Sequence, residues 1–395
     1  MRRTAAVAMA GAMLLLAGCQ DDGGGGSSSG ASSSAEAVPA TVSLSPADGS
    51  ADVSPVVPLE ITVADGELTE VVVTDGAGAP VPGSVADSAE DPAVDVWTPD
   101  VELAYGSTYT LTASAEGADE DVVEQKATFT TVTPGEVSTP DIGPLDGQTV
   151  GVGLPIRVYF DEPVVDQAAV ESHLLVESST PTDGVWSWMS DSEVHFRPST
   201  YWPANTDVTL HADLYGVDFG GGVWGEKDRT ISFRIGDKHV SVADAASHTM
   251  EVYEDDRLVQ TYPISAGSDD NPSHNGIHVV TELNRNRVMD SSTYGVPADS
   301  PGGYRTPVEY AVRISNNGEF VHAAPWSVAQ QGRANVSHGC INMSTERAAW
   351  FFSFSQAGDV VEIKNSIGPP LSRADGDIYD WTISWDEWRA GSALQ

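Results

Sequence analysis

The sequence predicts a mostly β protein, and three observations lead to this class. Segments in which apolar and polar residues alternate recur along most of the 395-residue chain, as at 59–63 and 156–160. A period of two is typical of half-buried strands. Turn residues such as Asp-Gly and Pro separate these segments, and they favour short strands joined by tight turns. Only the stretch that begins at Ser344 has the cap and the apolar faces of a substantial helix.

A repeat organises the first half of the chain. The segment that begins at Pro46 returns 98 residues later at Pro144, and each copy continues into an alternating strand. About a hundred residues of short strands and turns per copy is typical of an immunoglobulin-like sandwich. We therefore expect two tandem immunoglobulin-like domains, at 39–135 and 136–236.

The chain begins with the pattern of an export signal. Two arginines follow Met1, an apolar run follows them, and the small residues Ala17 and Gly18 precede Cys19. The apolar run is too short for a permanent membrane span. The order predicts a lipoprotein signal peptide at 1–18 and lipidation of Cys19. A protein of this kind is exported and anchored to the outer face of the cytoplasmic membrane, and residues 19–38, rich in Gly and Ser, supply a flexible linker.

The charge of the chain is strongly negative, with a formal value of −39. Between Arg3 and Arg157 the sole basic residue is Lys126. This balance argues against nucleic acid and anionic lipid surfaces as partners, and it favours a solubility or high-salt adaptation. The cysteines and histidines lack the spacing of metal ligands, so we expect no metal and no cofactor. We expect a monomer.

A third, β-rich domain is predicted at 237–365, with one main helix followed by a last strand at 360–363. The C-terminal extension at 366–395 should pack on the other domains. It contains three tryptophans whose spacings of four and three predict one face of a single short helix: Trp381, Trp385 and Trp388. We expect this aromatic face to dock on the second sandwich or on the third domain.

Cys340 is the candidate nucleophile of the third domain. It lies in the segment Ser337-His338-Gly339-Cys340-Ile341-Asn342. If Cys19 is acylated, Cys340 has no disulfide partner, and a free thiol in an oxidising compartment is usually kept for its reactivity. A thiol near neutral pH is only a few per cent thiolate, so a base must lie beside it.

Two histidines are candidates for that base, His338 and His322. His338 is two residues from Cys340, so the local turn dictates its position. His322 comes from a separate predicted strand and can be oriented independently, so we favour His322. Its other ring nitrogen needs an acceptor, for which a backbone carbonyl is suitable. Gly339 allows a sharp bend that leaves the amides of Gly339 and Cys340 free to hold an oxyanion, an arrangement that serves acyl transfer.

His322, fourteen intervening residues and then 337–342 resemble the signature of the L,D-transpeptidases of bacterial cell walls. Four further segments resemble the mycobacterial-type members, which are lipoproteins with two immunoglobulin-like domains before a catalytic domain of the YkuD type: 289–297, 303–306, 324–327 and 385–391. The resemblance covers the chain after the linker.

The resemblance implies an acyl transfer that makes 3→3 cross-links. In that reaction Cys340 attacks the carbonyl of the L-centre of meso-diaminopimelate in a tetrapeptide stem, releases D-alanine and passes the acyl group to the amine of another stem. His322 is implied as the base, the carbonyl of Ala323 as its orienting acceptor, and the amides of Gly339 and Cys340 as oxyanion donors. Members of the family are also acylated by carbapenems.

The resemblance also implies a set of substrate-binding residues. These are Tyr304 as a wall of the site, Met289, Tyr294 and Trp326 in the lid and cleft, and Ser337, His338 and Asn342 within the motif. One departure concerns Ala323, where close relatives have serine. The change is harmless if only the carbonyl at this position is used.

Three alternatives to the transpeptidase hypothesis stay open. An L,D-carboxypeptidase of the same fold would send the acyl group to water. A non-catalytic wall-binding lipoprotein would keep Cys340 as a vestige. A sortase-like enzyme also uses Cys and His, but no arginine stands in a matching motif. The two sandwiches either recognise wall glycan or peptide or act as a rigid spacer, and we favour the spacer.

Overall fold

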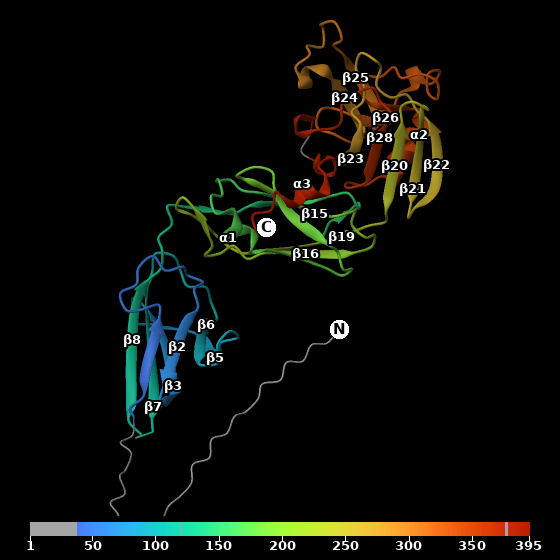
Figure 1. Cartoon of the computed structure of the whole chain (residues 1–395). Helices are drawn as coiled ribbons and strands as arrows, with labels where there is room; N and C mark the ends of the chain where they lie inside the picture. Colours follow the sequence, from blue (N-terminus) through green and yellow to red (C-terminus); the bar gives the residue numbers. More distant parts are fainter. Residues whose placement is uncertain (1–37, 119, 376–377) are drawn as a thin grey trace, which may run out of the picture.

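The computed structural model describes residues 38–118, 120–375 and 378–395. Within this part three β-rich units follow one another, with the first sandwich at one end and the third unit at the other (Figure 1). The chain is mostly β, as the alternation predicted. Within the described ranges no helix has the length and apolar character needed to cross a membrane. The predicted signal peptide and Cys19 lie outside the described residues.

The first sandwich consists of two four-stranded sheets. One has the order β1 (Thr41–Ser45), β2 (Leu59–Ala64), β6 (Val94–Pro99), β5 (Gly83–Asp87). The other has the order β4 (Pro80–Val81), β3 (Gly66–Asp75), β7 (Thr108–Gly117), β8 (Val122–Thr130). The core between them contains Leu59, Ile61, Trp97, Leu111 and Phe129. Leu59 and Ile61 alternate with exposed residues along β2, which is the period of two that marked this strand in the sequence.

The second sandwich repeats this plan and adds a small sheet. One main sheet has the order β10 (Asp141–Gly143), β12 (Ile156–Tyr159), β15 (Glu193–Pro198), β14 (Gly184–Trp188). The other has the order β11 (Thr149–Val150), β19 (Arg229–Ile235), β16 (Asp207–Ala212), β13 (Leu174–Ser178). The small sheet is β17 (Asp218–Gly220), β18 (Val223–Gly225), β9 (Glu136–Ser138), and α1 spans Gln167–Glu171. Val279, Val360 and Ile378 belong to the core of this sandwich, so it is continuous with the units that follow.

The third unit has two sheets and the main helix. The first sheet is β22 (Arg257–Pro263), β21 (Thr249–Glu254), β20 (His239–Asp244), β28 (Val360–Lys364), β23 (Gly276–Val279). The second is β24 (Glu282–Asp290), β25 (Arg305–Arg313), β26 (Phe320–Ala323), β27 (Ile341–Met343). Helix α2 (Thr345–Phe354) begins after Ser344, whose side chain accepts a hydrogen bond from the amide of Arg347, as the sequence predicted. It packs against β25 and β26 and so supports the second sheet from behind.

The C-terminal extension corrects one prediction. Its elements are η3 (Arg373–Asp375), η4 (Asp380–Thr382) and α3 (Trp385–Arg389). The three tryptophans do not share one helix, because Ile383 is extended and Ser384 starts a new helix as its cap. Their rings nevertheless converge on Arg197 of β15, with the guanidinium carbon 4.8, 5.3 and 4.5 Å from the ring centroids of Trp381, Trp385 and Trp388. The extension therefore docks on the second sandwich (Figure 1), and its indoles make cation–π contacts with Arg197.

Candidate active site

Strand pairing brings Cys340 and His322 together. β26 and β27 are parallel neighbours, and His322 pairs with Asn342, two residues beyond Cys340. Gly339 has φ of +117°, a backbone conformation that a residue with a side chain rarely adopts. This bend lies two residues before β27 begins at Ile341, with Cys340 between them. The bend at Gly339 was expected from the sequence. The parallel pairing of β26 with β27 was not.

The two residues line one pocket of about 170 Å³. Eight of the residues expected at the site line it together: Met289, Tyr304, His322, Trp326, Ser337, His338, Cys340 and Asn342. Three lining residues were not foreseen: Thr306, Val308 and Val336. Thr306 and Val308 stand on β25 beside Met289 and Arg287 of β24, so a prediction of that strand pair would have found them. Tyr294 lies in η1 (Ser291–Tyr294), and its side chain is outside the described part.

His322 is held as a neutral base. Its Nδ1 lies 2.9 Å from the carbonyl oxygen of Ala323. A carbonyl oxygen can only accept, so Nδ1 carries the ring proton and Nε2 keeps a lone pair. His322 is 4% exposed, and burial lowers its pKa, although the Ala323 carbonyl opposes this shift. An imidazole in this state can take a proton from a nearby thiol.

Cys340 is a neutral thiol at rest. It is 7% exposed, and burial raises its pKa to about 12. The charge of Glu319 adds to this rise, while a hydrogen bond from the backbone of Phe320 and the charge of Arg313 oppose it. Sγ lies 3.6 Å from the carbonyl oxygen of Gly318, toward which the thiol proton points. Proton removal must therefore accompany attack on a substrate, because a resting thiolate is strongly disfavoured.

The oxyanion prediction needs a correction at Gly339. Its amide is not free, because it donates to Oγ of Ser337 at 3.1 Å. The same hydroxyl donates to the carbonyl oxygen of Cys340 at 2.6 Å, so Ser337 closes a local turn around the nucleophile. In the described part of the chain the amide of Cys340 has no hydrogen-bond partner. Of the two amides, that of Cys340 is the one ready to meet a developing oxyanion.

Aromatic side chains and one amide complete the walls. The rings of Tyr304 and His338 are 4.9 Å apart, and the rings of His322 and Trp326 are 6.2 Å apart. Trp326 is 58% exposed, so its indole is open to a ligand. Asn342 donates through Nδ2 to Ser327 at 3.2 Å, and its buried Oδ1 has no partner within the described ranges.

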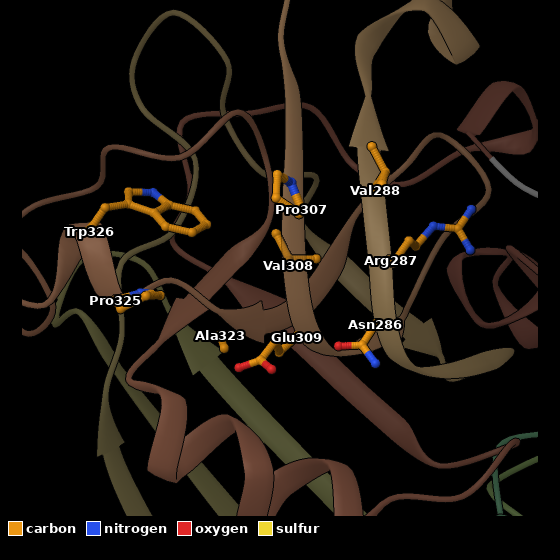
Figure 2. A pocket seen from close by; sticks show the side chains of 9 residues that line it. All are labelled: Asn286, Arg287, Val288, Pro307, Val308, Glu309, Ala323, Pro325 and Trp326. Atoms are coloured by element: carbon orange, nitrogen blue, oxygen red, sulfur yellow. The ribbon is translucent and has the colours of Figure 1, made fainter.

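A wider groove of about 510 Å³ adjoins this pocket and shares Val308 and Trp326 with it. Figure 2 shows the indole of Trp326 facing β25 and β24 across the groove. Ala323, expected only for its carbonyl, lines this groove rather than the pocket of Cys340. Among the described residues no cluster of His, Cys, Asp and Glu is arranged to hold a metal ion.

Comparisons with known proteins find relatives along most of this chain. The bacterial Ig domain family matches residues 50–218, and the L,D-transpeptidase catalytic domain family matches residues 238–363. L,D-transpeptidase 2 of Mycobacterium tuberculosis (strain CDC 1551 / Oshkosh) is 39% identical over 352 residues, which are 89% of this chain and 85% of that protein. L,D-transpeptidase 5 of M. tuberculosis (strain ATCC 25618 / H37Rv) is 41% identical over 361 residues, which are 89% of this chain and 77% of that protein.

A solved structure is also similar. The structure of LD transpeptidase LdtMt1 in complex with imipenem has a TM-score of 0.51 and 37% sequence identity, and the match covers 58% of this chain and 100% of that one.

Proposed function

The chain belongs to the L,D-transpeptidase family, and from that premise we propose that it forms 3→3 cross-links in peptidoglycan through a thioester on Cys340. One observation carries the proposal. Cys340 and His322 line the same pocket, and the contact of Nδ1 with the Ala323 carbonyl leaves Nε2 of His322 as a base. This pairing supports nucleophilic catalysis by the thiol.

In the proposed acylation, Nε2 of His322 takes the thiol proton as Sγ attacks the carbonyl at the L-centre of meso-diaminopimelate. The tetrahedral oxyanion meets the amide of Cys340. When the intermediate collapses, the bond to D-alanine breaks, and the leaving amine takes the proton from His322. The product is a thioester between Cys340 and the tripeptide stem.

In the second half, the side-chain amine of another stem attacks the thioester. His322 takes a proton from that amine and returns it to the sulfur as the C–S bond breaks. The new amide is the 3→3 cross-link, and the thiol is restored. If water replaced the amine, the same residues would perform the L,D-carboxypeptidase reaction, so the two activities differ only in which acceptor reaches the thioester.

We further propose that the protein is exported, lipidated at Cys19 and held at the outer face of the cytoplasmic membrane, and that it acts as a monomer. The export proposal rests on the pattern at 1–19. In the described part of the chain, two sandwiches precede the unit that holds the pocket (Figure 1). We assign them the role of a spacer that carries the site toward the cell wall.

The test uses the chain from residue 39 onward, which keeps every described strand and helix. This protein and its Cys340→Ala variant are incubated with a disaccharide-tetrapeptide, and the intact protein and product masses are read. We expect a tripeptide-acyl adduct on the unmodified protein alone and accumulation of cross-linked dimers. Tripeptide without dimers would favour the carboxypeptidase. No adduct and no product would favour the wall-binding lipoprotein.

A β-lactam supplies a second test. A similar protein was solved in complex with imipenem, so we propose that carbapenems acylate Cys340. The expected result is a mass increase equal to one imipenem on the unmodified protein and none on Cys340→Ala.

A further inference from the structure

A group of titratable side chains that the proposed mechanism does not use lies next to Cys340. Its centre is Glu319, whose side chain is 5% exposed. Oε1 of Glu319 accepts hydrogen bonds from the backbone amide of His274 at 2.8 Å and from Nδ1 of His274 at 3.1 Å. Nε2 of His274 lies 3.3 Å from Asp375. Both ring nitrogens thus face carboxylates, an environment that favours a protonated imidazole.

Two side-chain-to-backbone hydrogen bonds connect the neighbours of this pair to Cys340 and Gly339. The residue before Glu319 is Gly318, whose carbonyl accepts from Sγ of Cys340 at 3.6 Å. The residue before His274 is Ser273, whose hydroxyl donates to the carbonyl of Gly339 at 2.6 Å. The pair therefore ties together the two segments that hold Cys340 from either side.

The carboxylate of Glu319 also lies directly against the bend at Gly339. A Cβ built on Gly339 would lie 3.6 Å from Oε1 and from Cγ of Glu319. A negative charge at this place opposes the formation of a thiolate one residue away. The side chain of His274 contacts this carboxylate directly and compensates its charge when protonated.

Other groups around His274 are few. His278 of β23 contacts the carbonyl of His274 through Nε2 at 3.0 Å, and its Nδ1 lies 3.7 Å from Oε2 of Glu319. Nδ2 of Asn317 lies 3.1 Å from Nδ1 of His274 and donates to Oδ1 of Asp375 at 3.4 Å. His338 and Tyr304 line the same hollow of about 290 Å³ as His274 and Glu319. Within the described part of the chain, the charges closest to His274 are therefore the two carboxylates.

We propose that Glu319 and His274 are positioning residues for Cys340: the charged pair holds the backbone on both sides of the nucleophile, and protonated His274 shields the thiol from the charge of Glu319. The positioning role concerns the environment of the thiol. It rests on the proposed function only for the importance of that thiol in catalysis. The pair acts through Gly318, Gly339 and the electrostatic field, and neither side chain contacts the reacting atoms.

The proposal predicts a pH dependence with a definite sign. The carboxylate of Glu319, followed by the charge of Asp375, raises the pKa of His274 above its ordinary value of 6.5, against the opposing effect of burial. Shielding is therefore complete below pH 6.5 and is lost as the pH rises through the higher pKa of His274. Above that pH, His274 no longer compensates the charge of Glu319, and the opposing charge of Arg313 remains.

The test is the rate at which iodoacetamide alkylates Cys340, read by intact mass from pH 5.5 to 9.5. In the chain from residue 39 onward Cys340 is the sole cysteine, so the adduct is unambiguous. His274→Gln should slow alkylation on the order of five-fold below the pKa of His274 and leave it unchanged above, as expected for one charge at a partly buried site. Glu319→Gln should speed alkylation by a similar factor, most strongly at high pH, and the double variant should lose both effects.

A matched control is the pair of half-buried His211 and exposed Glu177 in the second sandwich, where Nε2 and Oε2 are 3.9 Å apart. His211→Gln and Glu177→Gln should leave the alkylation profile unchanged. If His274→Gln does not fold, Asp375→Asn replaces it as the test variant. This substitution should shift the inflection of the alkylation profile to lower pH, while His274 and Glu319 remain in place.

The proposal is overturned if His274→Gln slows alkylation equally at every pH, or if Glu319→Gln and Asp375→Asn leave the profile as it is. Alkylation needs no transpeptidase activity. If the variants shift the profile but no cross-linked product forms with the unmodified protein, the proposed function fails and the positioning role stands. If product forms and the variants do nothing, the positioning role fails alone.

Discussion

Two buried histidines of this molecule, His195 and His322, have opposite chemistry. His195 of the second sandwich is fully buried between two carboxylates, with Nδ1 2.8 Å from Asp380 and Nε2 2.8 Å from Glu193. Burial works to lower the pKa of His195, but the two carboxylates raise it above the ordinary value. His322 is buried against a backbone carbonyl alone, and burial lowers its pKa. The same side chain is therefore a cation in one place and a neutral base in the other.

The hydrogen-bond partner of a buried histidine, rather than its burial, decides its charge state. His195 joins β15 to Asp380 of the C-terminal extension, so its charge holds two distant segments together. His322 has no carboxylate among its hydrogen-bond partners in the described ranges, so its Nε2 remains available for proton transfer. A carboxylate at Nδ1 would raise the pKa of His322 and keep it protonated at lower pH.

The largest expected effect concerns the nucleophile that His322 serves. Cys340→Ala should lower kcat/KM for cross-linking by roughly 10⁴-fold or more, because no other group in the pocket can form the thioester. The measurement is product formation from the disaccharide-tetrapeptide, with circular dichroism to show that the fold is kept. Residual activity above one per cent would contradict the assignment of Cys340.

The second prediction removes the neutral histidine. His322→Gln should lower kcat/KM by about 10²- to 10⁴-fold, the range typical of a lost general base. In the unmodified protein the rate should fall only as the pH drops through the lowered pKa of His322, so activity should persist below pH 6.5. The pH profile of kcat/KM measures this limb. If the fall in kcat/KM were centred above pH 6.5, the ring of His322 would be charged at rest. His322 and His195 would then not differ in charge.

The third prediction removes a partner of the charged histidine. Asp380→Asn should destabilise the fold by about 3–5 kcal/mol, the usual cost of breaking a buried ion pair on one side. The free energy of unfolding in urea measures this. The contribution of His195 to the free energy of unfolding should be fully present below the pKa of the unfolded state, near 6.5. It should be lost as the pH rises through the higher pKa of His195 in the folded state.

The matched control for Asp380→Asn is Asp207→Asn. Asp207 pairs with Arg234 at 2.6 Å, but its side chain is 68% exposed, so its loss should be barely measurable. Equal effects of the two substitutions would show that burial does not govern the strength of the His195 cluster. The cross-linking activity of the folded Asp380→Asn protein should match that of the unmodified chain.

The smallest effect is expected at the acceptor of His322. Ala323→Ser should change kcat/KM by less than about twofold, because the contact with Nδ1 comes from the backbone carbonyl and not from the side chain. The same cross-linking assay measures it. A gain or loss of more than about tenfold would show that a hydroxyl at this position takes part in orienting the ring.

Features that depend on a few neighbouring residues could be predicted from the sequence. The alternation along β2, the cap at Ser344 and the bend at Gly339 each depend on local backbone preferences. That His322 serves Cys340 as its base was expected from residue chemistry. The parallel pairing of strands β26 and β27, which brings the two residues to one site, was not expected. The free amide expected at Gly339 was wrong, because the hydroxyl of Ser337 takes that hydrogen bond.

The mostly β class, the reactive segment around Cys340 and its resemblance to the L,D-transpeptidases could be recognised from the residues alone. The partners of the buried charges depend instead on how distant segments pack. Asp380 meets His195 across 185 residues of chain, Glu319 meets His274 across 45, and three tryptophans from two helices surround Arg197. Local preferences act over a few residues, whereas burial forces each charge to find a partner wherever packing provides one.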